Sequence, residues 1–405
     1  MQNINRFSKT KEAKQMWAVF IANICLIVIF AVISGIHGMY LGMNGIGIRE
    51  DYNFLIDILL LLAASLFNSL VAVLISVPVS GIGKHISFMQ LWLFAYINDG
   101  VTKKVRPNPD LLGFLASPVT VLNFDTHDEE SFRYANNLAA KFKLINLLAY
   151  DGLGIVFFLV SLIIGQHLFI GTLFYFLSLT ALGLAVFGSF PIRKKTVNLA
   201  GAYIRYKNDV MYGVSSISDS LVYVTRFNFD PAPVKDYANY KICSLLSDPT
   251  TNPDESMSML FAVSVFEDYT KNERTDYPRI IKDYMEYYIA NMDRLFTVNA
   301  TNEGRLCFCE LLSYLAVNGR REQAIDEYNK RIAYLLPLGK MAQSSNGFLR
   351  YILFNEDYAA WLYDRKNMQP TTLPFLHKWF EMPYILDATG TAAIHKLVWE
   401  KSPDA

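Results

Sequence analysis

Charge is scarce in this sequence and is missing altogether from three long stretches. Charged residues make up 18% of the 405 positions, and 37 basic side chains balance 37 acidic ones, so the formal net charge is zero. Without a run of Lys or Arg, the sequence does not indicate a nucleic-acid surface. No charged residue occurs from Gln15 to Ile48, from Ile58 to Gly83 or from Gly152 to Ile192. Each stretch exceeds the ~20 apolar residues that cross a bilayer, so we predict an integral membrane protein.

The motifs of common enzymes are also missing. No two of the six histidines stand four residues apart, so the zinc-protease motif H-E-x-x-H is absent. The phosphate loop G-x-x-x-x-G-K-[ST] and the nucleophile elbow G-x-S-x-G are absent as well. Two of the four cysteines, Cys307 and Cys309, form a C-x-C pair with no second Cys or His pair at zinc-finger spacing, which favours buried thiols over a metal site.

Four transmembrane helices account for the apolar stretches. The third stretch is long enough for two crossings, and Gly165, Gln166 and His167 interrupt it with a predicted turn. The first apolar run is too long for the h-region of a cleaved signal peptide. We predict spans at about residues 16–40, 56–82, 144–164 and 168–190.

Basic residues flank alternate loops between these spans. Four precede the first span, seven lie between the second and third, and three follow the fourth, whereas the two other loops hold only Arg49. The positive-inside rule therefore predicts a multi-pass cell-membrane protein with both termini in the cytoplasm. The predicted parts are 1–83 with two spans, a cytoplasmic loop at 84–143, two further spans at 144–192 and a cytoplasmic domain at 193–405.

The loop at 84–143 contains a predicted β-hairpin. Residues 86–97 are rich in aromatic and aliphatic side chains, Asn98-Asp99-Gly100 supplies a turn, and a strand-like run resumes at 101–105. Because so apolar a ribbon is unstable alone in water, we expect it to lie against the membrane surface or the helical bundle.

After residue 195 the sequence becomes amphipathic and helical. Predicted helices are 198–222, 234–247, 254–271, 276–295, 302–317, 321–336, 345–363 and 371–379. The fold class is thus a membrane all-α protein with a small β-hairpin, in which a four-helix transmembrane region precedes a cytoplasmic α-helical domain. The helical pairs resemble tetratricopeptide-like hairpins, which usually bind peptides or proteins, and a merely supportive bundle is an equal alternative.

Several short motifs together resemble a known family. These are Gly83-Lys84-His85-Ile86-Ser87-Phe88 after an apolar span, the aromatic hairpin, Gly113-Phe114-Leu115-Ala116-Ser117-Pro118, and Val197-Asn198-Leu199-Ala200-Gly201 after the fourth span. In this order they are similar to a Firmicutes branch of the bacterial site-2-protease-like intramembrane metalloproteases. That resemblance implies a zinc site with an H-E-x-x-H helix and a carboxylate from a later segment.

The positions that would carry those zinc ligands hold aliphatic side chains. By the resemblance, Leu70, Val71 and Leu74 occupy the H-E-x-x-H positions, and Ala200 replaces the carboxylate. Zinc must be held by nitrogen, oxygen or sulfur donors, so the resemblance implies a pseudoprotease with no cofactor.

What such a scaffold would retain is a ribbon able to pair with a membrane peptide or protein partner by strand addition. The candidate partner-binding residues on this ribbon are Ser87, Phe88, Trp92, Asp99 and Gly100. One alternative is an accessory subunit of a membrane transporter or exporter, whose partner would be a transporter ATPase. The other is an active membrane metallopeptidase with an unrecognised site that uses residues such as His85, Asp99 and Asp151.

Overall fold

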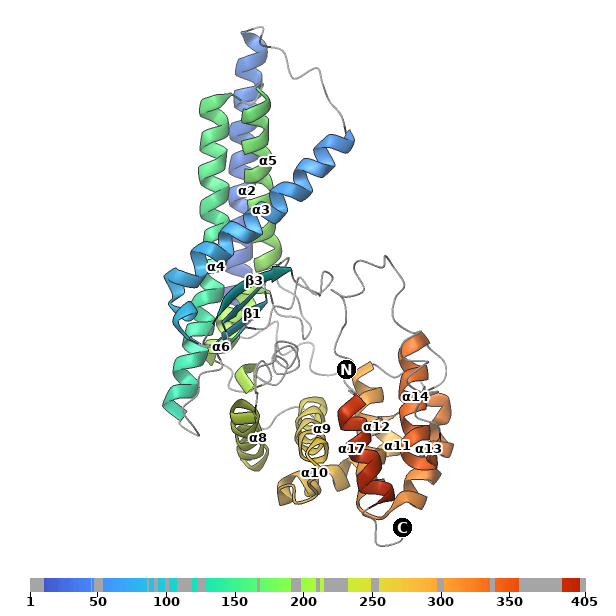
Figure 1. Cartoon of the computed structure of the whole chain (residues 1–405). Helices are drawn as coiled ribbons and strands as arrows, with labels where there is room; N and C mark the ends of the chain where they lie inside the picture. Colours follow the sequence, from blue (N-terminus) through green and yellow to red (C-terminus); the bar gives the residue numbers. More distant parts are fainter. Residues whose placement is uncertain are drawn as a thin grey trace. The chain divides into compact units, whose positions relative to one another are not determined.

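The chain divides into two compact units, Met1–Val234 and Lys235–Ala405. The computed structural model in Figure 1 describes residues 11–44, 46, 54–85, 87–90, 94–98, 102–107, 119–121, 129–165, 168–190, 198–208, 212–214, 232–248, 255–296, 302–335, 339–356 and 388–400.

Four long helices form the main part of the first unit. They are α2 (Lys11–Met43), α3 (Phe54–Ser80), α4 (Glu129–Ile164) and α5 (Phe169–Ser189). All four are long and apolar enough to cross a membrane, which confirms the four predicted apolar helices. However, α4 begins well before the predicted position near 144, because the amphipathic run that starts at Glu129 continues into the apolar segment without a break.

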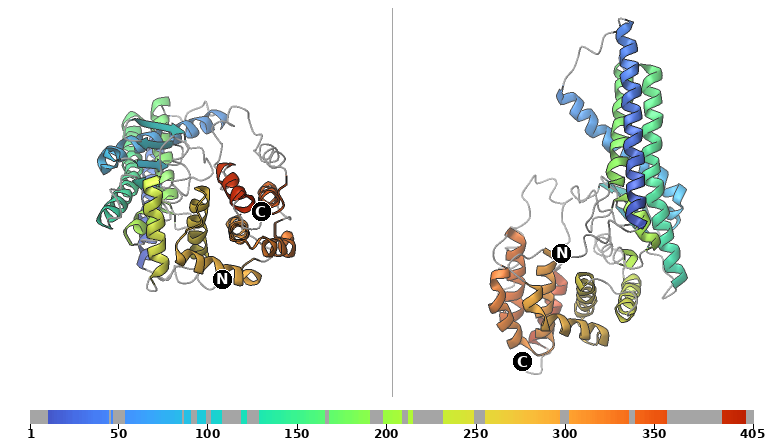
Figure 2. Two further views of the ribbon diagram at one scale, coloured as in Figure 1. Left: turned by 60° about the horizontal axis from the view of Figure 1, so that its bottom comes forward. Right: turned by 180° about the vertical axis from the view of Figure 1, so that it is seen from behind.

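The two helices α3 and α4, which follow one another along the chain, run in opposite directions. Phe67 packs against Phe157, and Ser76 bonds to Asn146 further along, so α3 and α4 are antiparallel. In Figures 1 and 2, α2, α4 and α5 lie alongside one another while α3 crosses them obliquely. Gly165, in the left-handed conformation with φ 96°, ends α4 at the predicted turn before α5.

Three asparagine side chains link helices within the bundle. The links run from Asn23 to Ser189, from Asn68 to Thr180 and from Asn146 to Ser76. Each joins two different helices over 2.8–3.2 Å. Away from these links, apolar side chains point outward, and Ile163 is 84% exposed. A lipid environment accommodates such a surface.

A four-stranded antiparallel sheet lies between α3 and α4 in the sequence. Its strands are β1 (Ser87–Gln90), β2 (Phe94–Asn98), β3 (Lys103–Pro107) and β4 (Val119–Val121), in the order β3-β2-β1-β4. The hairpin flanking Asn98-Asp99-Gly100 is confirmed as β2 and β3.

The sheet is larger than the predicted hairpin. Residues 86–97 do not form one strand, because β1 folds back on β2 with Phe88 opposite Ile97. This second pairing, together with β4, lets the sheet bury Met89, Tyr96 and Ile97, which a two-stranded ribbon would have left in water.

The helix after α5 belongs to the first unit. Asn198 caps α6 (Leu199–Asn208), because its side-chain oxygen accepts a bond from the Gly201 amide at 2.8 Å. Ala202 and Tyr206 then share a core with Phe142 of α4. The predicted helix 198–222 is described over α6 and at 212–214, its other residues lie outside the described residues, and α6 packs with α2, α4 and α5.

The second unit is helical throughout its described residues. Its helices are α8 (Ala232–Ser247), α9 (Glu255–Lys271), α10 (Arg279–Ala290), α11 (Met292–Leu295), α12 (Asn302–Val317), α13 (Arg321–Leu335), α14 (Gly339–Phe354) and α17 (Ala388–Trp399). The predicted helix 371–379 lies outside the described residues. α17 was not predicted, although Ile394, Leu397 and Val398 show the spacing of a buried helix face.

α12 is the centre of this unit. It packs against α9, α13, α14 and α17, and its residues from Cys307 to Ala316 are buried. Both cysteines of the C-x-C pair are free thiols inside this core, as predicted. Gly319, with φ 76°, ends α12 in a left-handed turn in which its amide and that of Arg320 bond back to the helix.

Candidate functional site

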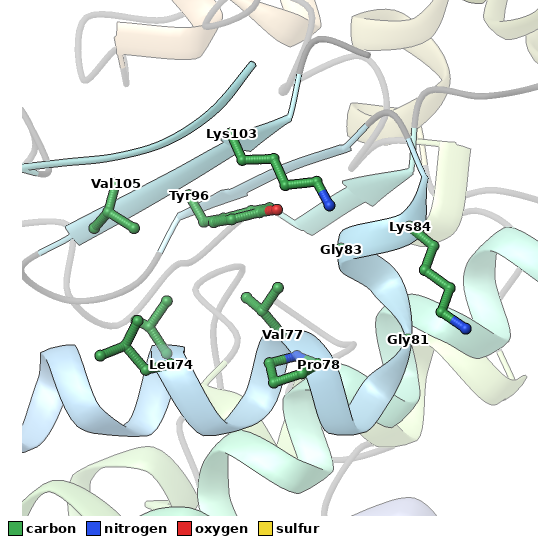
Figure 3. Close-up of a pocket in the computed structure, with 10 residues that line it drawn as sticks. Leu74, Val77, Pro78, Gly81, Gly83, Lys84, Tyr96, Lys103 and Val105 are labelled. Carbon is green, nitrogen blue, oxygen red and sulfur yellow. The ribbon is translucent and has the colours of Figure 1, made fainter. Parts of the chain in front are cut away.

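The most distinctive cavity of the first unit lies between α3 and the sheet. Its volume is about 380 Å³. The lining consists of Val73, Leu74, Val77, Pro78, Gly81, Gly83, Lys84, Tyr96, Lys103 and Val105. Figure 3 shows Leu74 and Val77 pointing from α3 toward Tyr96 and Val105 on the strands. We call this cavity the sheet cleft.

A tight turn at the end of α3 creates the cleft. Gly81 adopts a left-handed conformation with φ 79°, and its amide bonds to the Pro78 carbonyl oxygen at 3.1 Å. Gly83 brings the turn against both walls, since a Cβ atom there would lie 2.6 Å from Val77 Cγ1 and 3.3 Å from the Tyr96 hydroxyl oxygen. Any larger side chain at position 83 would force α3 and β2 apart.

Hydrogen bonds fasten this turn to the sheet. Asn98, at the end of β2, donates from its side-chain nitrogen to the carbonyl oxygens of Gly83 at 3.1 Å and of His85 at 2.8 Å. Ser87 donates from its hydroxyl to the His85 carbonyl oxygen at 3.0 Å. The distance between α3 and the sheet is therefore fixed by the chain itself.

The edge strand β3 forms the outer wall of the cleft. All five of its residues are exposed, and Lys103 and Val105 face the cleft while Lys104 falls on the alternate side. Among the described residues, β3 pairs only with β2, which leaves its other edge without a strand. An edge strand of this kind can accept a further strand by backbone hydrogen bonds.

The cleft is apolar along most of its length and basic at one end. Leu74, Val77 and Val105 supply aliphatic surface, whereas Lys84 and Lys103 bring positive charge. Burial raises the pKa of the Tyr96 hydroxyl above its ordinary value, so this group stays protonated and able to donate a hydrogen bond. None of the described residues that line the cleft is acidic.

Of the candidate partner-binding residues, the structure describes Ser87 and the backbone of Phe88. Ser87 is buried at 1% exposure and its hydroxyl is bonded within the turn, so its role in the structure is to support the sheet. Phe88 lies in β1 opposite Ile97, on an inner strand. Trp92, Asp99 and Gly100 lie outside the described residues.

The positions matched to the zinc ligands do not converge. Leu74 is 57% exposed and lines the sheet cleft, and Leu70 and Val71 are half-buried on the same helix. Ala200 packs instead against Ala72, in a core between α3, α4 and α5.

The residues present do not fit a zinc site. The side chains at the four matched positions are aliphatic and offer no donor atom. Within the described part of the chain, no group of three His, Cys, Asp or Glu residues is placed to hold a metal ion.

Comparison with protein-family models, with curated proteins and with solved structures finds no match to this chain. The function is therefore argued from the geometry of the site alone.

Sequence reasoning missed the residues that build the sheet cleft. The sequence did contain signals for the turn that creates the cleft. They are Pro78, Gly81 and Gly83, since a proline followed by two glycines marks the end of a helix and a tight turn. What the sequence could not give was the pairing of β1 with β2, which places Tyr96 and Val105 over Leu74.

Proposed function

We propose that this chain is a multi-pass membrane scaffold without catalytic activity, which holds an extended segment of a membrane peptide or protein partner in the sheet cleft. The observation that carries the proposal is that the outer edge of β3, beside an apolar cleft, pairs with no other strand that the structure describes. The role is that of a pseudoprotease, which binds or escorts a peptide and does not cut it.

Strand addition explains how a peptide would be held. Backbone groups of the incoming strand would pair with the free edge of β3, and every second side chain would enter the cleft. Those side chains would meet Leu74, Val77 and Val105, so apolar residues are favoured there. Lys103 at the basic end would favour an acidic residue or a terminal carboxylate.

The side chains at the positions matched to the zinc ligands support a role without catalysis. Hydrolysis by a metal requires a bound ion that activates water, and the aliphatic side chains at Leu70, Val71, Leu74 and Ala200 cannot bind one. The described lining of the cleft also holds no carboxylate and no histidine that could act as a general base.

The basic residues at the ends of the helices support one orientation of the chain in the membrane. Lys14, Lys84 and Lys141 lie at the same end of the antiparallel bundle, because α2 and α4 begin there and α3 ends there. This arrangement supports a cytoplasmic location for that end and for both termini. The sheet cleft would then open at the cytoplasmic face of the membrane.

Peptide binding to the full chain in nanodiscs tests the proposal. The probes are fluorescent ten-residue peptides that alternate Val and Thr and carry one Glu. The control peptides have the same side chains with N-methylated backbone amides, which cannot pair as a strand. We expect the unmodified peptides to bind and to slow amide hydrogen exchange in residues 103–106, while the methylated peptides bind at least ~10-fold more weakly because they lose several backbone hydrogen bonds.

Equal binding of both peptide sets would mean that strand addition is not the mode of recognition. Cleavage of the bound peptide would contradict the non-catalytic role. If no unmodified peptide slows amide exchange in β3, the cleft is not the peptide-binding site.

A further inference from the structure

A second cavity lies on the other side of the turn that forms the sheet cleft. Its volume is about 400 Å³, and it lies between the end of α3 and the first half of α4. Lys84 belongs to both cavities, and Figure 3 shows its side chain extending away from the strands. We call this second cavity the basic pocket.

Hydrogen-bond donors and positive charges dominate the basic pocket. Tyr134, Asn137 and Lys141 stand three and four residues apart, so they share one face of α4 and point to the same space. From the other side the turn contributes Lys84 and His85, whose ring lies 5.7 Å from that of Tyr134 in an edge-to-face arrangement.

The described lining of the basic pocket carries no opposing charge. It contains neither Asp nor Glu. Within the described part of the chain, neither Lys84 nor Lys141 forms an ion pair, whereas the neighbouring Arg133 is paired with Glu129. Two free ammonium groups beside hydroxyl and amide donors make a site for an anion with several acceptor oxygens.

The pocket lies at the border between the apolar and charged parts of both helices. The charge-free stretch of α3 ends at Gly83, immediately before Lys84, and α4 becomes free of charge after Asp151. Leu148 follows Lys141 by two turns on the same face of α4 and is 56% exposed, and Val79 on α3 is 57% exposed. In a bilayer this border coincides with the phosphate headgroups, with hydrocarbon beside Leu148 and Val79.

We propose that the basic pocket binds an anionic phospholipid. Its phosphate would accept hydrogen bonds from Lys84, Lys141 and the Tyr134 hydroxyl, and an acyl chain would run along Leu148. A lipid rather than a free anion is favoured because apolar surface continues directly from the charged pocket. The proposal is independent of peptide binding, since Tyr134, Asn137 and Lys141 do not line the sheet cleft.

The test compares two double variants of the full chain that lose the same charge. Lys84→Gln with Lys141→Gln removes both ammonium groups of the pocket. Lys14→Gln with Lys104→Gln removes two exposed lysines, one at the same end of the bundle and one on β3, neither of which lines the pocket. Native mass spectrometry of the purified protein, titrated with phosphatidylglycerol or phosphatidylcholine, measures lipid retention.

We expect the wild type and the Lys14/Lys104 variant to retain phosphatidylglycerol in preference to phosphatidylcholine. The Lys84/Lys141 variant should lose roughly 10- to 30-fold in affinity for phosphatidylglycerol, as two juxtamembrane lysines predict. Lys84→Arg with Lys141→Arg should restore binding, which separates loss of charge from misfolding.

Three results would overturn the proposal. They are equal retention of the two lipids, equal losses in both glutamine variants, and full displacement of phosphatidylglycerol by inorganic phosphate, which would make the pocket a free-anion site. The single variant Lys141→Gln is measured in both the lipid assay and the peptide assay. In phosphatidylcholine nanodiscs, which hold no anionic lipid, its peptide binding should equal that of the wild type, while its retention of phosphatidylglycerol falls, so the two proposals can fail separately.

Discussion

The side-chain nitrogen of Asn68 on α3 lies 2.7 Å from the carbonyl oxygen of Leu177 on α5. The same nitrogen lies 2.8 Å from the hydroxyl of Thr180. This contact holds α3 against the bundle two turns before Leu74. It therefore also fixes the helix that forms one wall of the sheet cleft.

Replacing Asn68 with Leu should loosen α3. The variant loses the link to α5 and leaves the Leu177 carbonyl without this donor, so we expect a loss of about 0.6–1.7 kcal/mol in the free energy of unfolding, the range for polar links between membrane helices. Unfolding in bicelles measures it. Ser65→Ala is the control, because the Ser65 hydroxyl bonds only to Leu61 on its own helix and its loss should cost less. Equal losses would show that the interhelical link contributes nothing.

Because α4 packs closely on α5, alanine substitutions at two nearby glycines of α4 should differ strongly in their effect on stability. A Cβ atom at Gly154 would lie 2.6 Å from Leu182 Cδ2, whereas one at Gly152 would meet nothing within 4 Å. Gly154→Ala should destabilise the bundle by about 1–3 kcal/mol through overpacking. Gly152→Ala should be neutral or stabilising by up to ~1 kcal/mol, because alanine is the better helix former. Thermal unfolding in the same detergent ranks the two, and a more stable Gly154→Ala variant would refute the contact.

Peptide affinity should depend on Leu74. Its side chain is 57% exposed and lines the sheet cleft, so Leu74→Gln should weaken peptide binding by roughly 10-fold, the cost of exchanging one apolar contact for a polar group, without unfolding the chain. Leu66→Gln is the matched control, since Leu66 is exposed on α3 but does not line the cleft. Fluorescence anisotropy with the strand peptides measures both affinities. Similar affinities for the two variants would place the peptide elsewhere.

The stability of the second unit should depend on pH through the ionisation of Glu310. This carboxyl is fully buried, and both of its oxygens lack a hydrogen-bond partner among the described residues. Burial raises its pKa well above the ordinary value, the Glu267 charge on α9 raises it further, and Lys271 opposes them. Because the pKa of Glu310 is higher in the folded state, its contribution to the free energy of unfolding depends on pH. The contribution is complete below the unfolded pKa of about 4.3 and is lost as the pH rises through the folded pKa.

Glu310→Gln should therefore stabilise the second unit at neutral pH and not at acidic pH. The expected gain at pH 7 is about 1–3 kcal/mol, since the variant avoids burying an unpaired charge. Hydrogen exchange of α12 amides in the full chain, corrected for the intrinsic rate at each pH, measures it. Glu322→Gln, at an exposed position on α13, should show no such dependence. A gain that does not change with pH would contradict the assignment to Glu310.

The sequence predicted the elements whose length and composition are extreme. Three charge-free stretches became four long helices, and Asn23, Asn68 and Asn146 link these helices as amides in apolar segments can do.

The sequence argument that assigned the zinc positions could not predict which face of α3 packs against the neighbouring helices. Counting along the chain placed Leu74 where a ligand would stand, but Ala72 is the residue that meets Ala200. An all-apolar helix gives no hydrophobic face to read. The better signal was polar, since Asn68, Ser69, Ser76 and Ser80 are all buried.

The turn from Gly81 to Lys84 has the sheet cleft on one side and the basic pocket on the other. A ligand that shifts this turn from one side will alter the affinity for a ligand on the other side. By thermodynamic reciprocity, the second ligand must then change the affinity for the first by the same factor. A few residues of backbone between α3 and β1 would thus couple the lipid composition of the membrane to the retention or release of a bound peptide.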